Sequence, residues 1–71
     1  MTNKNLLEAE MKRRGDNGNV LAEFLEITPN TLSKKKRGRA EFTQSEIMKM
    51  KERYSLSASS LDEIFFGKEL S

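Results

Sequence analysis

The chain contains no cysteine and no histidine, and these two absences exclude several kinds of chemistry. Without cysteine it can form neither disulfides nor thiolate metal sites, and without histidine it lacks the commonest general base and metal ligand. No paired-carboxylate or glycine-rich phosphate-binding signature replaces them, so we expect no enzyme, no metal and no cofactor. A single proline and few β-branched residues favour helices over strands.

Long apolar runs are absent as well. No segment approaches the length needed to cross a membrane, and residues 1–5 lack the apolar region of a signal peptide. We therefore expect one soluble cytoplasmic domain over residues 1–71, with a small core and modest stability. We expect neither a membrane nor a small molecule among its partners.

Positive charge, by contrast, is concentrated in one place. Five of the 13 basic side chains lie in residues 34–39, and the other 8 basic and 11 acidic side chains leave the rest of the chain at −3. A protein whose overall charge is only +2 thus presents a strong local field. A polyanion, most often nucleic acid, is the binding partner that such a field favours.

Helical spacing and helix-end signals predict five short helices. The first covers about residues 3–14 and ends at Gly15. The second covers residues 20–26, and either Asn17 or Asn19 caps it. The inward positions that we expect in these two helices are Leu6, Leu7, Ala9, Met11, Leu21, Ala22 and Leu25.

Three further helices follow. The third opens at Thr28, a good N-cap that precedes Pro29, and ends at Gly38. The fourth begins with a capping box at residues 43–46, and the fifth covers residues 57–66. The inward positions expected in and beside these helices are Ile27, Leu32, Phe42, Ile47, Met50, Tyr54, Leu61, Ile64 and Phe65.

The second and third helices form the pattern of functional interest. Only Glu26, Ile27 and Thr28 separate them, and so short a connection forces a steep crossing, the helix-turn-helix arrangement. The outward side of the third helix carries short amides, hydroxyls and cations. Asparagine can pair bidentately with adenine, and lysine or arginine with guanine, on major-groove base edges. These outward residues are Asn30, Ser33, Lys34 and Arg37.

Residues 21–33, which read Leu-Ala-Glu-Phe-Leu-Glu-Ile-Thr-Pro-Asn-Thr-Leu-Ser, resemble the core of the Cro/C1-type (XRE-like) helix-turn-helix regulators. Residues 42–66 are similar to the ending common in small phage and prophage repressors. The resemblance implies an all-α, compact five-helix lambda-repressor-like domain with its helix-turn-helix at helices 2 and 3, about residues 18–38. It also implies a bacterial or phage-encoded transcriptional regulator that binds a double-stranded DNA operator sequence-specifically, in most members as a homodimer. Because the chain leaves no room for a self-cleaving or ligand-sensing domain, we expect a Cro-like organisation.

The recognition helix then covers about residues 29–37, and the expected DNA contacts lie in and around it. Family members usually have Gln or Thr at the start of the second helix to hold the DNA backbone, where this chain has Gly18 and Asn19. Lys35 and Lys36 follow the inward Leu32, so we expect their stems on apolar surface and their ammonium groups in solvent. The expected DNA-binding residues are Asn19, Thr28, Asn30, Thr31, Ser33, Lys34, Arg37 and Arg39.

Two positions depart from a simple DNA-binding surface. The family often has glycine where Glu26 stands, and a residue there tends to need a positive φ or a close turn, at a modest strain for Glu. The role of an acidic side chain near the groove-facing helix is unexplained. Phe24 lies on the less buried side of its helix. The alternative function is a small protein-interaction module, antitoxin- or anti-repressor-like, that uses the helix-turn-helix as a scaffold. RNA binding ranks lower because residues 28–41 contain no aromatic side chain.

Overall fold

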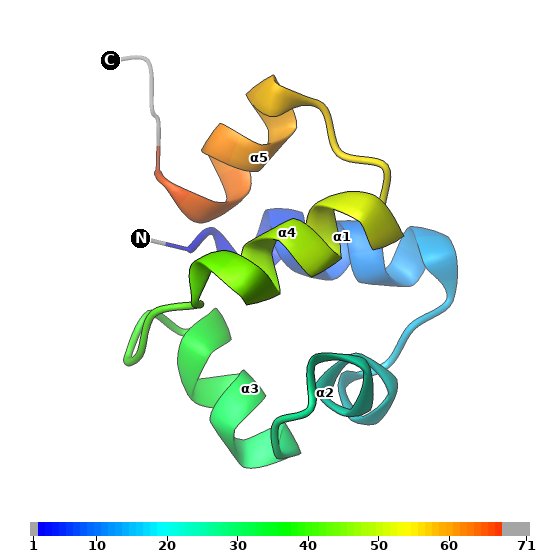
Figure 1. The fold of residues 1–71 in the computed structure, drawn as a ribbon, viewed down its shortest axis with the longest axis vertical. Coiled ribbons are helices and arrows are strands. Elements are labelled where there is room, and N and C mark those ends of the chain that lie inside the picture. Colours follow the sequence, from blue (N-terminus) through cyan, green and yellow to red (C-terminus); the bar gives the residue numbers. More distant parts are fainter. Residues whose placement is uncertain (1, 68–71) are drawn as a thin grey trace.

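Five helices make up the fold of residues 2–67, the part of the chain that the computed structural model describes (Figure 1). They are α1 (Lys4–Arg14), α2 (Gly18–Leu25), α3 (Pro29–Lys36), α4 (Gln44–Arg53) and α5 (Ala58–Phe65). Residues 2–67 contain no strand, so the predicted all-α, five-helix fold is confirmed. None of these helices has the length and apolar character needed to span a bilayer.

Each helix begins at a short polar residue whose side chain accepts a hydrogen bond from the backbone N–H three residues later. These caps are Asn3, Asn17, Thr28, Thr43 and Ser57. Such a cap satisfies one of the amides that a helix start leaves without a partner. The caps predicted at Thr28 and Thr43 are confirmed, and Asn17 rather than Asn19 caps α2.

Left-handed backbone conformations follow the first three helices. The φ angles are 89° at Gly15, 63° at Glu26 and 81° at Gly38. Glycine adopts this conformation without a steric penalty, whereas a residue with a side chain carries strain. The α3 helix ends at Lys36, and Arg37 caps it, so it stops slightly before the predicted end at Gly38.

One cluster of buried hydrophobic side chains forms the core, and all five helices contribute to it. The rings of Phe42 and Phe65 meet edge to face within it, with centroids 5.6 Å apart, and link the segment before α4 to α5. Leu6 and Ala9 are exposed, so the expectation that they widen the inward face of α1 was wrong. The buried cluster consists of Leu7, Met11, Leu21, Ala22, Leu25, Leu32, Phe42, Ile47, Met50, Tyr54, Leu56, Ile64 and Phe65.

The helices are stacked along the longest axis of the molecule (Figure 1). The α2 and α3 helices pack against each other at one end, α5 lies at the other, and α1 and α4 lie between them. The α1 helix packs against α5, where the backbone N–H of Asn3 donates to the carbonyl of Ile64 at 2.6 Å. This arrangement leaves the outer side of α2 and α3 remote from α5.

Candidate nucleic-acid interface

The α3 helix starts with two threonines whose hydroxyls bond each other. Thr28 Oγ1 accepts from the backbone N–H of Thr31 at 3.1 Å and donates to Thr31 Oγ1 at 2.9 Å. Pro29 occupies the first helical position, where its missing N–H costs nothing. The hydroxyl of Thr28 is therefore used by the helix start, and the hydroxyl of Thr31 still has a proton to donate elsewhere.

The outward side of α3 carries a polar stripe. Asn30, Lys34 and Arg37 are exposed and stand at i, i+4 and i+7, so they follow one another along one helical face. Ser33 is half-buried beside them, and Leu32 is buried on the other side. The structure thus brings together the predicted residues Asn30, Lys34 and Arg37 and leaves Ser33 at the edge of the stripe.

Lys35 and Lys36 lie on the inward side of α3, and each ends in an ion pair. Lys35 Nζ is 2.7 Å from Glu46 Oε1, and Lys36 Nζ is 3.1 Å from Glu8 Oε2. The side chains of Lys35 and Glu46 are each only 11% exposed. The prediction that both ammonium groups reach solvent was wrong, because acidic side chains from α1 and α4 meet them on the inward face.

Three cations of the basic run, Lys34, Arg37 and Arg39, are exposed to solvent, and no acidic side chain within residues 2–67 pairs with them. The backbone N–H of Arg39 donates to the carbonyl of Lys34 at 2.9 Å, so residues 37–39 fold back onto the end of α3. We call Lys34, Arg37 and Arg39 the cationic triad.

Asn19, the predicted DNA-backbone anchor, lies exposed in the first turn of α2. It does not cap the helix, because the side chain of Asn17 accepts from the backbone N–H of Val20 at 2.8 Å. A Cβ atom added at Gly18 would meet no atom within 4 Å. A small side chain would therefore fit at Gly18, and the helix dipole gives the start of α2 a partial positive charge.

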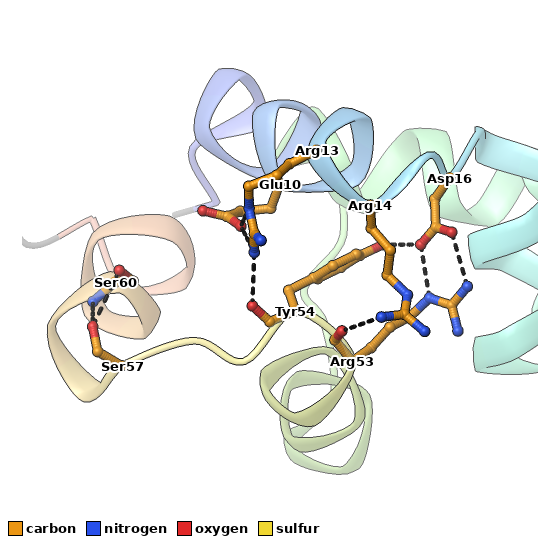
Figure 2. Close-up of polar contacts among 8 residues, drawn as sticks. All are labelled: Glu10, Arg13, Arg14, Asp16, Arg53, Tyr54, Ser57 and Ser60. Atoms are coloured by element: carbon orange, nitrogen blue, oxygen red, sulfur yellow. Dashed lines mark hydrogen bonds and ion pairs between the residues drawn. The ribbon is translucent and has the colours of Figure 1, made fainter.

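A polar cluster around the buried carboxylate of Asp16 fastens the turn before α2 to the end of α4. Asp16 accepts two hydrogen bonds from the Arg53 guanidinium, at 2.7 and 2.8 Å, and one from the Tyr54 hydroxyl at 2.7 Å (Figure 2). Arg13 and Arg14 reach across from α1 and donate to the carbonyls of Tyr54 and Arg53, at 2.9 and 3.1 Å. Sequence reasoning missed this cluster, because its members lie 37 and more residues apart.

Arg53 also covers the exposed aromatic ring of α2. Its guanidinium carbon lies 4.6 Å from the centroid of the Phe24 ring, close enough for a cation–π interaction. Phe24 is on the less buried side of its helix, as predicted, and the guanidinium shields one part of it. The α2 helix is therefore held from α4 at two points, Phe24 in its body and Asp16 ahead of its start.

Burial and hydrogen bonding set the charge states in this cluster. Hydrogen bonding from Arg53 is the largest effect on Asp16; burial opposes it, Tyr54 reinforces it, and the pKa falls from 3.8 to about 2. Burial, followed by the hydrogen bond to Asp16, raises the pKa of Tyr54. Because the folded-state pKa of Asp16 lies below its ordinary value, its stabilisation is complete above about pH 4 and is lost as the pH falls toward 2.

Glu26 has a positive φ, the first of the two conformations expected there, and its side chain points into solvent. The residue is the left-handed cap of α2, and its side chain is 82% exposed. Its nearest cation is Lys49, whose Nζ lies 3.5 Å from Glu26 Oε2. An exposed pair of this kind contributes little to stability, so the acidic side chain does not compensate for the backbone strain.

We compared the chain with protein-family models, curated proteins and solved structures, and none of them matches. No relative therefore assigns a role to Asn30 or to the cationic triad. Their exposure, spacing and charge are the grounds for a functional proposal.

We predict that Asp16→Asn destabilises the protein by about 2 kcal/mol at pH 7, because the variant loses the carboxylate that Arg53 stabilises. The difference from the parent should shrink as the pH falls from about 4 toward 2, where the parent carboxylate begins to be protonated in the folded state as well. Urea unfolding at a series of pH values measures this. Glu52→Gln removes an exposed acid from α4 and is the matched control; an equal loss there, or a pH-independent loss for Asp16→Asn, contradicts the prediction.

We predict that Glu26→Gly stabilises the protein by up to about 1 kcal/mol. Glycine adopts the positive φ without steric strain, and this gain exceeds the entropy that it adds to the unfolded chain. Glu26→Gln removes the same charge and keeps the strain, so it should leave the unfolding free energy nearly unchanged. Thermal unfolding of both variants beside the parent separates strain from charge. Equal stabilisation by the two substitutions would show that charge is responsible.

Proposed function

We propose that the protein is a sequence-specific regulator of transcription that binds double-stranded DNA, in the manner of the Cro/C1-type regulators that it resembles. In this proposal α2 and α3 form the helix-turn-helix, and α3 enters the major groove. The observation that carries it is the exposed stripe of Asn30, Lys34 and Arg37 on α3, with Arg39 folded back beside its end. Such a stripe combines donors and acceptors suited to base edges with positive charge suited to phosphates.

The chemistry of each side chain suggests its part. The Asn30 amide can pair with adenine, Lys34 and Arg37 can pair with guanine or meet a phosphate, and Arg39 can meet a phosphate. Ser33 and Thr31 can donate to a phosphate or base from the edge of the stripe, Asn19 can meet the DNA backbone, and Thr28 acts as the helix cap. Since the ammonium groups of Lys35 and Lys36 are neutralised internally, they add little to this field.

The same proposal includes a location and a symmetry. We propose that the protein acts in the bacterial cytoplasm, encoded by a phage or prophage, and binds as a homodimer. Its two copies would read a near-palindromic operator whose half-site centres lie about one helical turn, roughly 34 Å, apart. In-vitro selection of bound duplexes from a random pool would return the half-site, its symmetry and its spacing together.

A second candidate function, a protein-interaction module, is favoured by an apolar pocket on the side of α4 and α5. Phe66 is 54% exposed and Met48 is also exposed, and both line a pocket of about 400 Å³. Phe42, Ile47 and Leu61 complete its apolar lining. A gel shift on random duplex at low salt separates the two candidates, because a protein-interaction module would show no retention at micromolar concentration.

We predict that the double variant Lys34→Ala, Arg37→Ala binds duplex DNA at least about tenfold more weakly than the parent, because each contact contributes about 1–3 kcal/mol. The variant Lys4→Ala, Lys51→Ala loses the same charge from α1 and α4 and is the matched control. If three phosphates are neutralised per subunit, the parent should show a slope of roughly −2.7 in log K against log salt. Equal binding by the Lys34, Arg37 variant and the parent would refute the assignment of α3.

A further inference from the structure

One carboxylate oxygen joins the end of α3 to the beginning of α4. Glu46 Oε1 accepts from Lys35 Nζ at 2.7 Å and from the backbone N–H of Thr43 at 2.9 Å. The Lys35 ammonium also lies 5.9 Å from the centroid of the Phe42 ring. A side chain from α3 and the backbone of the α4 cap therefore meet at a single atom.

The charge state of Glu46 favours this contact. Burial raises the pKa of Glu46, but hydrogen bonds from Lys35 and Thr43 outweigh that effect and the pKa is lowered overall. The carboxylate is therefore charged at neutral pH, and the hydrogen bond from Lys35 is of the stronger, charge-assisted kind.

The segment closed by this contact carries part of the cationic triad. Residues 36–42 form the connection between Lys35 and the α4 cap, and they include Arg37 and Arg39. The start of the connection is folded back by backbone hydrogen bonds from Gly38 to Lys35 and from Arg39 to Lys34, at 3.2 and 2.9 Å. The local bonds fix the start of the connection on α3, and the contact at Glu46 ties α3 to the α4 cap at its other end.

We propose that Lys35 and Glu46 are positioning residues for DNA binding: their buried pair holds the segment that presents Arg37 and Arg39 to the phosphates. This inference rests on the proposed function. Lys35 then acts on DNA through Glu46 and not by direct contact, although it lies within the basic run. Glu46, an acidic residue, then increases the affinity for a polyanion.

The sign of the effect at Glu46 gives a sharp test. Glu46→Gln keeps the size of the side chain and an acceptor for the Thr43 N–H, but it removes a negative charge. General electrostatics predicts tighter DNA binding, whereas positioning predicts weaker binding, by up to about fivefold, the factor that separates charge-assisted from neutral hydrogen bonds. Glu41→Gln removes an exposed charge from the same connection and should bind as the parent does or more tightly.

A salt titration tests the role of Lys35. Lys35→Met removes the ammonium group and should weaken DNA binding while leaving the slope of log K against log salt unchanged. Lys35→Arg keeps a cation that can pair with Glu46, so its affinity should be close to that of the parent. A phosphate contact by Lys35 would instead reduce the slope by about 0.9. Duplex binding is measured where circular dichroism shows that each variant is folded, so that loss of fold does not imitate loss of positioning.

A measurement without DNA separates this inference from the proposed function. Amide hydrogen exchange at Gly38 and Arg39 should be faster in Glu46→Gln than in the parent and unchanged in Glu41→Gln. If the parent binds no duplex but Glu46→Gln exchanges faster than the parent at these amides, the proposed function is refuted and the mechanical role of the pair remains. If the parent binds duplex, and Glu46→Gln and Glu41→Gln have the same affinity and the same exchange rates, the positioning role is refuted and the proposed function remains.

Discussion

A buried carboxylate lies at each end of α4, and each forms an ion pair that joins α4 to another part of the chain. At the first turn Glu46 holds Lys35 of α3, and at the last turn Arg53 holds Asp16 from the connection between α1 and α2. A buried charge that loses its partner is costly, so each pair restricts the fold to arrangements that keep it intact. In a domain with so small a core, these two pairs fix where α2 and α3 lie relative to α4.

The local features of the fold could be predicted from the sequence because they depend on neighbouring residues. Thr43 and Glu46 are three residues apart, so the capping box is visible in the sequence, and Gly15 marks the end of α1 for a similar reason. The partners of Lys35 and Asp16 depend instead on tertiary packing. Spacing placed Lys35 on the inward face, but only the assembled fold shows that Glu46 meets it there.

The candidate site was predictable to a similar degree. Spacing alone separates the outward Lys34 and Arg37 from the inward Lys35 and Lys36, and the structure keeps that division. The spacing does not reveal that acidic side chains neutralise Lys35 and Lys36, nor that Arg39 folds back to Lys34. The five basic residues of this run therefore fall into two groups. Lys35 and Lys36 form ion pairs within the fold, and the cationic triad carries the charge that we propose meets DNA.

The open space around Gly18 has a consequence for how this surface can change over time. The residue stands at the first position of α2, and a Cβ atom placed there would meet no atom within 4 Å. The buried pairs and the core do not involve it, so this position can vary without disturbing the parts that hold the fold. A single substitution could therefore add a side chain near the helix that we propose enters the groove, and so adjust the proposed affinity for DNA, while the buried pairs and the core stay the same.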